Sequence, residues 1–340
     1  MFSRKMALAL LFLLFLSVGL VLLGWGEMFP LFSIKGPMKG VNSLAFCPDG
    51  KKLFSGSWDG MVLVWDPLSG KKIGGIIDSD CGRGIACSPD GKVLATGGFD
   101  GAIRFWDTAS CDRILESPAH SESIASVKYS PSGKYFASAS RDGTAQLRDG
   151  KSRQLLFVFK KHTGVVNDLA FSFDEKEMVT AGSDGCVVLW DLPKKKEINC
   201  FRSHRKNVKR VVFLSNDKVV STESLRVGSG IVKSTILIWS KKDGKEFSRI
   251  ENINGTIYSL AVSPCQRVFA SGHSSGEVTL WECATGKRIC KLKGHSGLVM
   301  ALAFSPQTAT LASGSAMGNE LGEIKIWDMK NFCKNAKIQE

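Results

Sequence analysis

The sequence predicts an all-β fold built from seven copies of one unit. A large side chain closes each copy at steps of 41 to 49 residues, namely Trp65, Trp106, Arg148, Trp190, Trp239, Trp281 and Trp327. A second marker keeps the same phase, namely Phe46, Cys87, Tyr129, Phe171, Phe213, Val262 and Phe304. Turn residues follow this marker, as in Pro48-Asp49-Gly50, where proline presets the turn and glycine tolerates a positive φ. Because the two marker residues and the turn recur in the same order in successive copies, the repeat reflects the architecture of the fold.

The copy from Leu155 to Asp191 shows the unit most completely. It holds four short runs rich in Val, Leu, Phe or Trp, near residues 155–159, 165–171, 177–181 and 186–190. Turn residues separate these runs, which is typical of β-strands. Four further side chains stand at fixed places along the unit: His162, Thr180, Asp184 and Trp190.

This unit resembles the WD repeat, a family in which each repeat corresponds to one four-stranded blade of a β-propeller. The resemblance implies a seven-bladed propeller over residues 27–340. It also implies that His162, Thr180, Asp184 and Trp190 form a hydrogen-bonded chain inside their blade, which is a structural role. The spacing here agrees with the period of roughly 40 to 45 residues expected for one blade.

Several copies depart from the pattern. The histidine position holds Pro37, Asp78 and Ile253 in the first, second and sixth copies. In the third copy Arg148 replaces the indole. We expect its guanidinium either to bond Asp142 or to point to solvent, and we expect this blade to be locally weaker because a packed aromatic ring is lost.

The N-terminus predicts a hydrophobic helix ahead of the propeller. Met6 to Trp25 is about twenty residues without a charge, preceded by Arg4 and Lys5, and is long enough to cross a bilayer. Residues 1–26 are therefore expected to be a single-pass membrane anchor, and the charge bias favours a propeller outside the cytoplasm. A signal segment cleaved near Gly26, which would give a secreted protein, and a cytoplasm-facing propeller are the alternatives.

The segment Leu31–Lys35 is predicted to close the ring. Its sequence LFSIK matches the outermost-strand position of the other copies, although its own blade has not yet begun. In the WD-repeat family such a leading strand completes the last blade and removes an exposed sheet edge. The tail Ala336–Gln339 is a rival for the same place.

Partner binding is expected on one face of the ring, the top. Two copies carry insertions, Thr222–Ser234 and Ala316–Gly322, and insertions in repeat proteins lie in loops on one face, often the binding face. The predicted contact residues are the large or basic side chains of these loops and of the neighbouring turns, namely Trp58, Phe99, Arg141, Arg205, Lys206 and Arg226. Tryptophan and arginine dominate interface energies, so a protein or peptide partner is expected.

Composition and charge narrow the partner and the chemistry. The net charge of +13 favours an acidic partner, whereas the basic run from Arg202 to Arg210 lacks the interleaved aromatics typical of nucleic-acid binding. Ten cysteines contain no C-x-x-C pair and show no ligand spacing with the five histidines, so no metal or other cofactor is expected.

Four of the histidines fit the blade pattern, and the fifth, His273, has no acid at triad-like spacing. We therefore expect a monomeric, non-catalytic scaffold. The alternative is an extracytoplasmic propeller that binds or hydrolyses a small ligand in its central channel.

Overall fold

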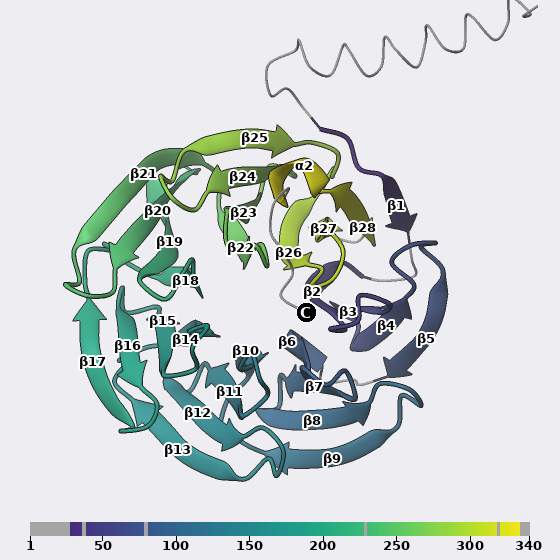
Figure 1. Ribbon diagram of the computed structural model, residues 1–340, viewed down its shortest axis with the longest axis horizontal. Helices are drawn as coiled ribbons and strands as arrows, with labels where there is room; N and C mark the ends of the chain where they lie inside the picture. Colours follow the sequence, from purple (N-terminus) through teal and green to yellow (C-terminus); the bar gives the residue numbers. More distant parts are fainter. Residues whose placement is uncertain (1–27, 36–38, 78–80, 228–229, 318–319, 334–340) are drawn as a thin grey trace, which may run out of the picture.

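Seven four-stranded antiparallel sheets make up the part of the chain that the computed structural model describes, residues 28–35, 39–77, 81–227, 230–317 and 320–333. The sheets are arranged as blades around one axis, with the first strand of each blade innermost (Figure 1). The all-β, seven-bladed propeller is therefore confirmed. The N-terminal segment 1–26 lies outside the described residues. Among the described residues, no helix has the length and apolar character needed to span a bilayer.

The strands of the first four blades follow the chain in order. Blade one contains β2 (Val41–Phe46), β3 (Leu53–Ser57), β4 (Met61–Trp65) and β5 (Lys72–Ile77). Blade two contains β6 (Cys81–Cys87), β7 (Val93–Gly98), β8 (Ala102–Asp107) and β9 (Arg113–Pro118). Blade three contains β10 (Ile124–Tyr129), β11 (Tyr135–Ser140), β12 (Thr144–Asp149) and β13 (Leu155–Lys160). Blade four contains β14 (Val166–Phe171), β15 (Glu177–Gly182), β16 (Val187–Asp191) and β17 (Lys196–Phe201).

The last three blades include the two lengthened copies. Blade five contains β18 (Val208–Phe213), β19 (Lys218–Val227), β20 (Ile231–Ser240) and β21 (Glu246–Asn254). Blade six contains β22 (Ile257–Val262), β23 (Val268–His273), β24 (Val278–Glu282) and β25 (Arg288–Leu292). Blade seven contains β26 (Leu298–Phe304), β27 (Thr310–Met317), β28 (Glu320–Asp328) and β1 (Phe32–Lys35), and the short helix α2 (Lys330–Cys333) follows it.

The ring closes where β1 pairs with β28. The pairing is antiparallel and runs from Phe32 opposite Ile326 to Lys35 opposite Glu323. Figure 1 shows β1 at the outer edge of the last blade, beside the strand nearest the C-terminus. Ile34 is buried in the apolar cluster shared by blades seven and one. The first and last strands of the propeller are thus joined in one sheet, and the rival tail 336–339 lies outside the described residues.

Asp-Gly turns connect the second and third strands in several blades. In blade four, Oδ1 of Asp184 accepts a hydrogen bond from the backbone N of Cys186 at 3.1 Å, and Gly185 has a φ of 82°. Blade two repeats the arrangement, because Oδ1 of Asp100 accepts from the N of Ala102 at 3.0 Å and Gly101 has a φ of 79°. Aspartate caps the tight turn, and glycine alone adopts this positive φ without strain.

The core of the molecule is divided into seven apolar clusters, each between two neighbouring blades. The cluster between blades four and five packs Leu189 and Phe201 against Val211 and Trp239, all of them buried. Because every blade buries one face on each neighbour, stability is spread around the circle instead of being concentrated in one centre.

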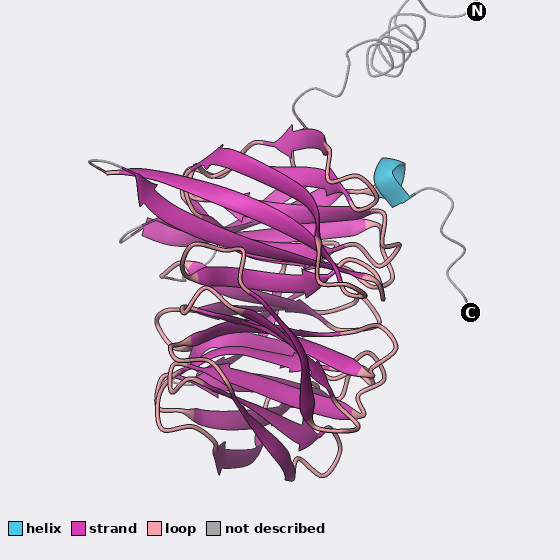
Figure 2. Ribbon diagram, turned by 90° about the vertical axis from the view of Figure 1, so that its left-hand side faces the viewer, coloured by secondary structure: helices cyan, strands magenta, loops and turns pink. Residues whose placement is uncertain are grey.

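The two faces of the disc differ in their connections (Figure 2). We call the top the face that carries the turns between second and third strands and the loops from one blade to the next. We call the bottom the face with the other two kinds of turn. The β19–β20 hairpin pairs ten residues, from Lys218 opposite Ser240 to Val227 opposite Ile231, whereas β15 and β16 pair five. The insertion in the fifth copy therefore lengthens a hairpin toward the top.

Candidate partner-binding face

Blade four contains the complete hydrogen-bonded chain of four side chains. Thr180 lies at its centre, because its Oγ1 is 2.8 Å from Nε2 of His162 and 3.0 Å from Nε1 of Trp190. Nδ1 of His162 lies 3.0 Å from Oδ1 of Asp184. The indole N–H can only donate. The Thr180 hydroxyl therefore accepts a hydrogen bond from Trp190 and donates one to Nε2 of His162. His162 then carries its proton on Nδ1 and donates it to Asp184.

This chain ties the loop that enters the blade to the strands within it. Oδ2 of Asp184 also accepts from the backbone N of Thr163 in the loop, at 3.0 Å. Burial alone would raise the pKa of Asp184, but the hydrogen bonds from His162 and from two backbone N–H groups lower it below its usual value. The carboxylate is therefore held in its ionised form as a structural acceptor.

Blades five and seven use a glutamate where blade four uses aspartate. Nε2 of His295 lies 2.7 Å from Oγ of Ser313, and its Nδ1 lies 3.3 Å from Oε2 of Glu323. Burial would raise the pKa of Glu323, yet His295 and Lys325 lower it to about 2. In blade five Nε2 of His204 lies 2.6 Å from Oγ of Ser221, and its Nδ1 lies 3.7 Å from Oε2 of Glu223, which is too far for a hydrogen bond. Both glutamates belong to lengthened hairpins without an Asp-Gly turn, so the repeat pattern did not reveal them.

Blade six completes its chain with a histidine from within the sheet. Ile253, at the position of the missing histidine, lies in β21, but His273 at the end of β23 places Nε2 2.8 Å from Oγ of Ser271. The same hydroxyl accepts from Nε1 of Trp281 at 2.7 Å. Burial lowers the pKa of His273 to about 4, so the imidazole is neutral near pH 7. The histidine that stood outside the repeat pattern is therefore part of the blade.

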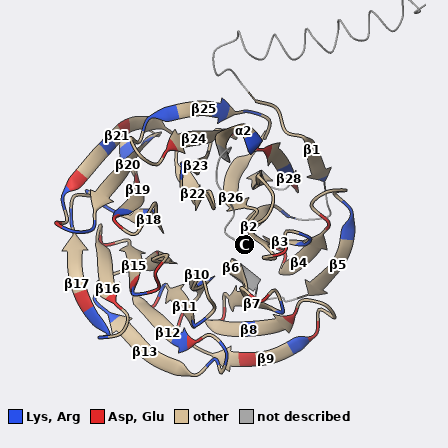
Figure 3. Cartoon of the chain, viewed as in Figure 1, with Lys and Arg blue, Asp and Glu red and all other residues tan. Residues whose placement is uncertain are grey.

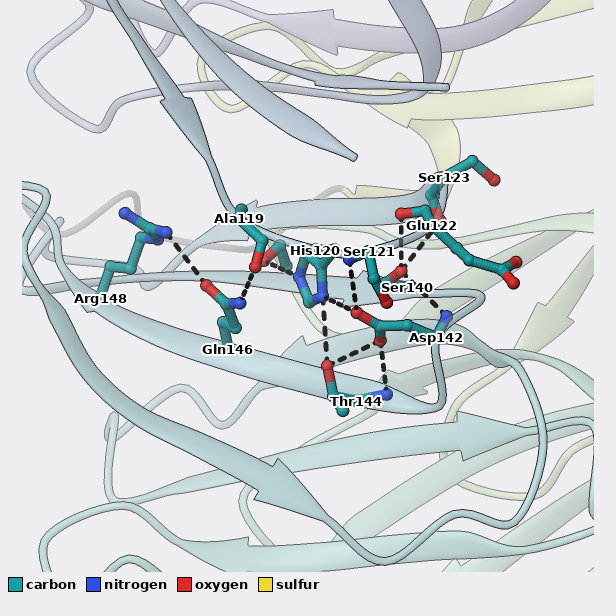
Figure 4. Close-up of polar contacts among 11 residues, drawn as sticks. Ala119, His120, Ser121, Glu122, Ser123, Ser140, Asp142, Thr144, Gln146 and Arg148 are labelled. Atoms are coloured by element: carbon teal, nitrogen blue, oxygen red, sulfur yellow. Dashed lines mark hydrogen bonds and ion pairs between the residues drawn. The ribbon is translucent and has the colours of Figure 1, made fainter. Parts of the chain in front are cut away.

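Blade three replaces the indole with a hydrogen-bonded guanidinium (Figure 4). Arg148 is buried, and its Nη2 donates to Oε1 of Gln146 at 3.0 Å while Nη1 donates to Oγ of Ser117 at 3.2 Å and to the carbonyl oxygen of Arg153 at 3.1 Å. Asp142 bonds His120 instead, at 2.9 Å. The expectation that Arg148 would bond Asp142 or reach solvent is wrong, because Gln146, Ser117 of blade two and the carbonyl of Arg153 supply acceptors for its two terminal nitrogens, while its buried Nε makes no hydrogen bond.

In blade two an arginine neutralises the turn aspartate. Nη2 of Arg104 lies 2.5 Å from Oδ2 of Asp100, and its Nε lies 3.3 Å from Oε2 of Glu116. Burial would raise the pKa of Asp100, but the hydrogen bonds from Arg104 and from the backbone N of Ala102 lower it. Arg104 thus contacts the turn aspartate of blade two, as His162 from the preceding loop does in blade four.

The predicted contact residues of the first three blades project from the top turns. Trp58 and Phe99 are 41% and 46% exposed, which is unusual for aromatic side chains, and Arg141 is exposed as well. Trp58 follows β3, Phe99 follows β7 and Arg141 follows β11, so each stands at the same turn of its blade.

Trp58 lines a cavity of about 380 Å³ at the top mouth of the central channel. Across this cavity lie Lys209, Arg210 and Tyr258. Nε of Arg210 donates to the carbonyl oxygen of Tyr258 at 2.5 Å, and Nζ of Lys209 lies 5.4 Å from the centre of the Tyr258 ring. The two basic residues are therefore held in place by blade six, although they belong to blade five.

A second cavity of about 300 Å³ adjoins the first and is lined by Arg141. Asn167 and Asn207 border both cavities. Nδ2 of Asn167 donates to Oδ1 of Asn207 and to the carbonyl oxygen of Val208, both at 2.8 Å. Arg141, Lys209 and Arg210 are the charged residues that line the two cavities, so the charge lining this part of the mouth is entirely positive.

Arg205, Lys206 and Arg226 are exposed on the top face but do not line these two cavities. The backbone N of Arg205 and of Lys206 donate to Oε2 of Glu223, at 2.8 and 3.2 Å. Arg226 stands opposite Val232 near the end of the long hairpin. Trp58 and Arg141 thus line the two adjoining cavities, whereas these three residues and Phe99 line neither of them.

Several residues of the mouth were not singled out from the sequence. They are Asn42, Asn167, Asn207, Tyr258, Leu298 and Met300. A signal was available, because Asn42, Asn167, Lys209, Tyr258 and Met300 each stand four residues before the second repeat marker of their copy. That position lies at the top of the innermost strand, where the seven blades converge.

Below the mouth the channel narrows to a cavity of about 70 Å³ lined by all seven innermost strands. Most of its lining is small or apolar, and the charged members are Lys128, Asp168 and Arg210. Oδ2 of Asp168 accepts from the backbone N of Val211 at 3.2 Å. Among the described residues no group of three or more His, Cys, Asp or Glu side chains could hold a metal ion.

Lysine and arginine residues also lie on outer strands of the blades, such as β5, β9 and β25 (Figure 3).

Comparison with known proteins supports the architecture. A search of curated proteins gave no match. The structure is similar to a solved structure described as that of U3-55K, with a TM-score of 0.75, 19% sequence identity and coverage of 87% of this chain and 98% of that one. At 19% sequence identity, this similarity shows that the two proteins share a fold.

Six segments match the family described as WD domain, G-beta repeat: residues 28–66, 79–107, 110–149, 153–191, 247–282 and 286–328. The stretch between the fourth and fifth matches holds β18, β19 and β20, so the structure supplies the remaining blade. The matches cover more than half of the sequence, and the chain belongs to the WD-domain, G-beta repeat family.

Proposed function

We propose that this protein is a non-catalytic scaffold, tethered to a membrane, that binds an acidic protein or peptide segment across the top mouth of its propeller. WD propellers are typically protein-interaction scaffolds, and that is the general basis of the proposal. The observation that carries it is the juxtaposition of exposed Trp58 with Lys209 and Arg210 around one cavity.

The chemistry of the mouth suits an acidic segment with an apolar anchor. Trp58 offers a large apolar surface at small entropic cost, and aromatic and arginine side chains contribute most to binding energy at interfaces. Arg210 and Lys209 are oriented by Tyr258, so little side-chain freedom remains to be lost when a carboxylate binds. Positive charge around a low-dielectric opening also attracts an acidic partner over several ångströms.

Binding of acidic peptides to the full chain tests this proposal. A display library of acidic peptides is selected on the detergent-solubilised protein, and the affinity of the best peptide is measured by fluorescence anisotropy. Trp58→Ala and Arg210→Ala are each expected to weaken binding by about tenfold or more, which corresponds to the loss of one good interface contact.

The matched control is Lys176→Ala, because Lys176 is an exposed lysine in a bottom-face turn of blade four. It should leave the affinity unchanged apart from a small effect of net charge. Equal affinity of the control and both mouth variants would contradict a binding site at the mouth. The peripheral residues Phe99, Arg205, Lys206 and Arg226 would then be the next to substitute.

The membrane tether rests on the uncharged stretch from Met6 to Trp25 and on Arg4 and Lys5 before it. Met28, the first described residue, bridges to Leu292 on the outer strand of blade six. A tether would therefore hold the ring by its rim and leave the top mouth open to a partner. After extraction of membranes with alkaline carbonate, the full chain should stay in the pellet, whereas cleavage near Gly26 would release a shortened protein.

A small ligand would have to bind in the mouth cavity of about 380 Å³, because the channel below it is too small. The channel below the mouth offers about 70 Å³, and binding sites for small organic ligands measure roughly 300 to 1,000 Å³. Its few charged residues do not include a nucleophile paired with a base. We therefore propose the scaffold function in preference to a small-ligand function.

A further inference from the structure

Two cysteine sulfurs meet at the contact between blades one and two. Cys47 directly follows β2 of blade one, and Cys87 is the last residue of β6 of blade two. Their Sγ atoms lie 3.2 Å apart, although 40 residues separate them in the chain. This distance is shorter than ordinary contact between two sulfur atoms and matches a hydrogen bond from one thiol to the other.

The surroundings hold this pair in place. Cys47 is buried in the apolar cluster between the two blades, where Phe54 and Leu94 are fully enclosed. Cys87 packs against the same cluster but remains partly exposed. A disulfide has an S–S bond of about 2.05 Å, so the sulfurs need to approach by only about 1 Å.

The hydrogen bond also makes the two sulfurs chemically unequal. When the thiol of Cys87 donates to Cys47, it lowers the pKa of Cys47 and raises that of Cys87. Burial and the charge of Asp49 oppose this effect on the pKa of Cys47, and Lys52 adds the smallest effect, which lowers it. The lowered pKa favours Cys47 as the sulfur that ionises, and the thiolate is the nucleophilic form of cysteine.

We propose that Cys47 and Cys87 are an oxidisable dithiol, which a hydroperoxide converts into a disulfide that joins blades one and two. The thiolate of Cys47 attacks one oxygen of hydrogen peroxide, the O–O bond breaks and hydroxide leaves, which gives a sulfenic acid. The sulfur of Cys87 then attacks the Cys47 sulfur, the S–O bond breaks, and the departing hydroxide takes the Cys87 proton as water. Two thiols lose two electrons, and the peroxide is reduced.

Cys283 and Cys290 are less reactive, and Cys186, which interacts with Cys200, has a raised pKa. Burial raises the pKa of Cys290 to about 11 and that of Cys283 to about 12, so both stay protonated and unreactive at neutral pH. Burial and the nearby Cys200 raise the pKa of Cys186 to about 12 as well. A bond between blades one and two would restrain the first blade, which also lies beside the closing blade of the ring.

Peptide mapping of the full chain tests this inference without a variant. The protein, purified under reducing conditions, is treated with a small excess of hydrogen peroxide, and the remaining thiols are blocked with N-ethylmaleimide before digestion. Two of the ten cysteines should escape blocking, and mass spectrometry should find one linked peptide that contains Cys47 and Cys87. Dithiothreitol should restore both thiols.

Two variants sharpen the result. Cys87→Ser should abolish the linked peptide and leave Cys47 as a sulfenic or sulfinic acid, whereas Cys290→Ala should behave like the unaltered chain. A linked peptide that joins Cys47 or Cys87 to the neighbouring Cys111, or peroxide treatment that leaves both thiols free, would overturn the proposal. Neither outcome depends on whether the top mouth binds a peptide.

Discussion

His273 and Ser271 lie two residues apart on the same strand, and Nε2 of the histidine is 2.8 Å from Oγ of the serine. In blade four the corresponding histidine comes from the loop before the blade, 18 residues ahead of its hydroxyl partner. The two blades therefore reach the same contact by different routes. A hydroxyl that accepts from a buried indole needs an acceptor for its own proton, and either route supplies one.

The first prediction concerns the stability of the protein between pH 6.5 and pH 4. Burial lowers the pKa of His273 from 6.5 to about 4, so in this range the unfolded chain binds a proton that the folded chain does not. The contribution of a neutral His273 is thus complete above pH 6.5 and is lost as the pH falls toward 4. The full effect is roughly 3 kcal/mol at most.

Urea unfolding at pH 7.0 and pH 4.5, on the original chain and on His273→Gln, measures this effect. The glutamine variant should be less stable at pH 7.0, and the difference between the two proteins should shrink at pH 4.5. A constant difference at both pH values would show that protonation of His273 is not linked to folding.

The second prediction concerns the hydroxyl at the centre of blade four. Thr180→Val keeps the side-chain shape but leaves Trp190 without an acceptor and His162 without a donor. We expect the free energy of unfolding to fall by about 2 kcal/mol, since an unsatisfied buried polar group costs about 1 to 3 kcal/mol. Thr163→Val, at an exposed position of the adjoining loop, should change stability little. Equal losses in the two variants would argue against the hydrogen-bonded chain.

The third prediction concerns the guanidinium of blade three. Arg148→Leu removes donors from Gln146, from Ser117 and from the carbonyl of Arg153. We expect destabilisation by about 2 kcal/mol, because hydrogen bonds to charged groups contribute about 1.5 to 3 kcal/mol each and a buried leucine recovers part of that loss. Hydrogen exchange should localise the loss to β12 and its neighbours. An unchanged midpoint of urea unfolding would contradict a stabilising role for Arg148.

The fourth prediction concerns ring closure through β1. Ile34 is 4% exposed and packs against blade one, so Ile34→Ala should lower the free energy of unfolding by about 2 to 5 kcal/mol. The matched control is Ile73→Ala, because Ile73 lies in the outer strand β5 of blade one but is 52% exposed. The control should lose far less. If both substitutions cost the same, the β1 contact adds nothing to the closed ring.

The fifth prediction separates backbone conformation from packing. Gly101 has a φ of 79°, and a Cβ there would meet the carbonyl oxygen of His120, so Gly101→Ala should be strongly destabilising. Gly230 has a φ of 90° with nothing within 4 Å of a Cβ. Gly230→Ala should therefore lower the free energy of unfolding only through the unfavourable φ, by about 1 kcal/mol. Thermal unfolding of both variants tests the difference, and similar melting temperatures would contradict the steric argument.

The sequence by itself determined the number of blades, the place of each turn and the closing tryptophans. Each repeat contains its own strand pattern and turn residues. These features can be recognised within one repeat, because they do not depend on contacts with neighbouring blades. The same local pattern predicted that Trp58, Phe99 and Arg141 stand at equivalent turns.

Only the tertiary structure decided which side chains complete the blades and the mouth. Glu323 of β28 lies near His295 of the loop before β26, Arg148 bonds Gln146 within β12 and Ser117 on another strand, and Trp58 and Arg210 line one cavity. These contacts depend on the register of strands and on the curvature of the ring, which bring distant residues within bonding distance. A repeat pattern records where a residue stands in its own unit, but not what the next unit places beside it.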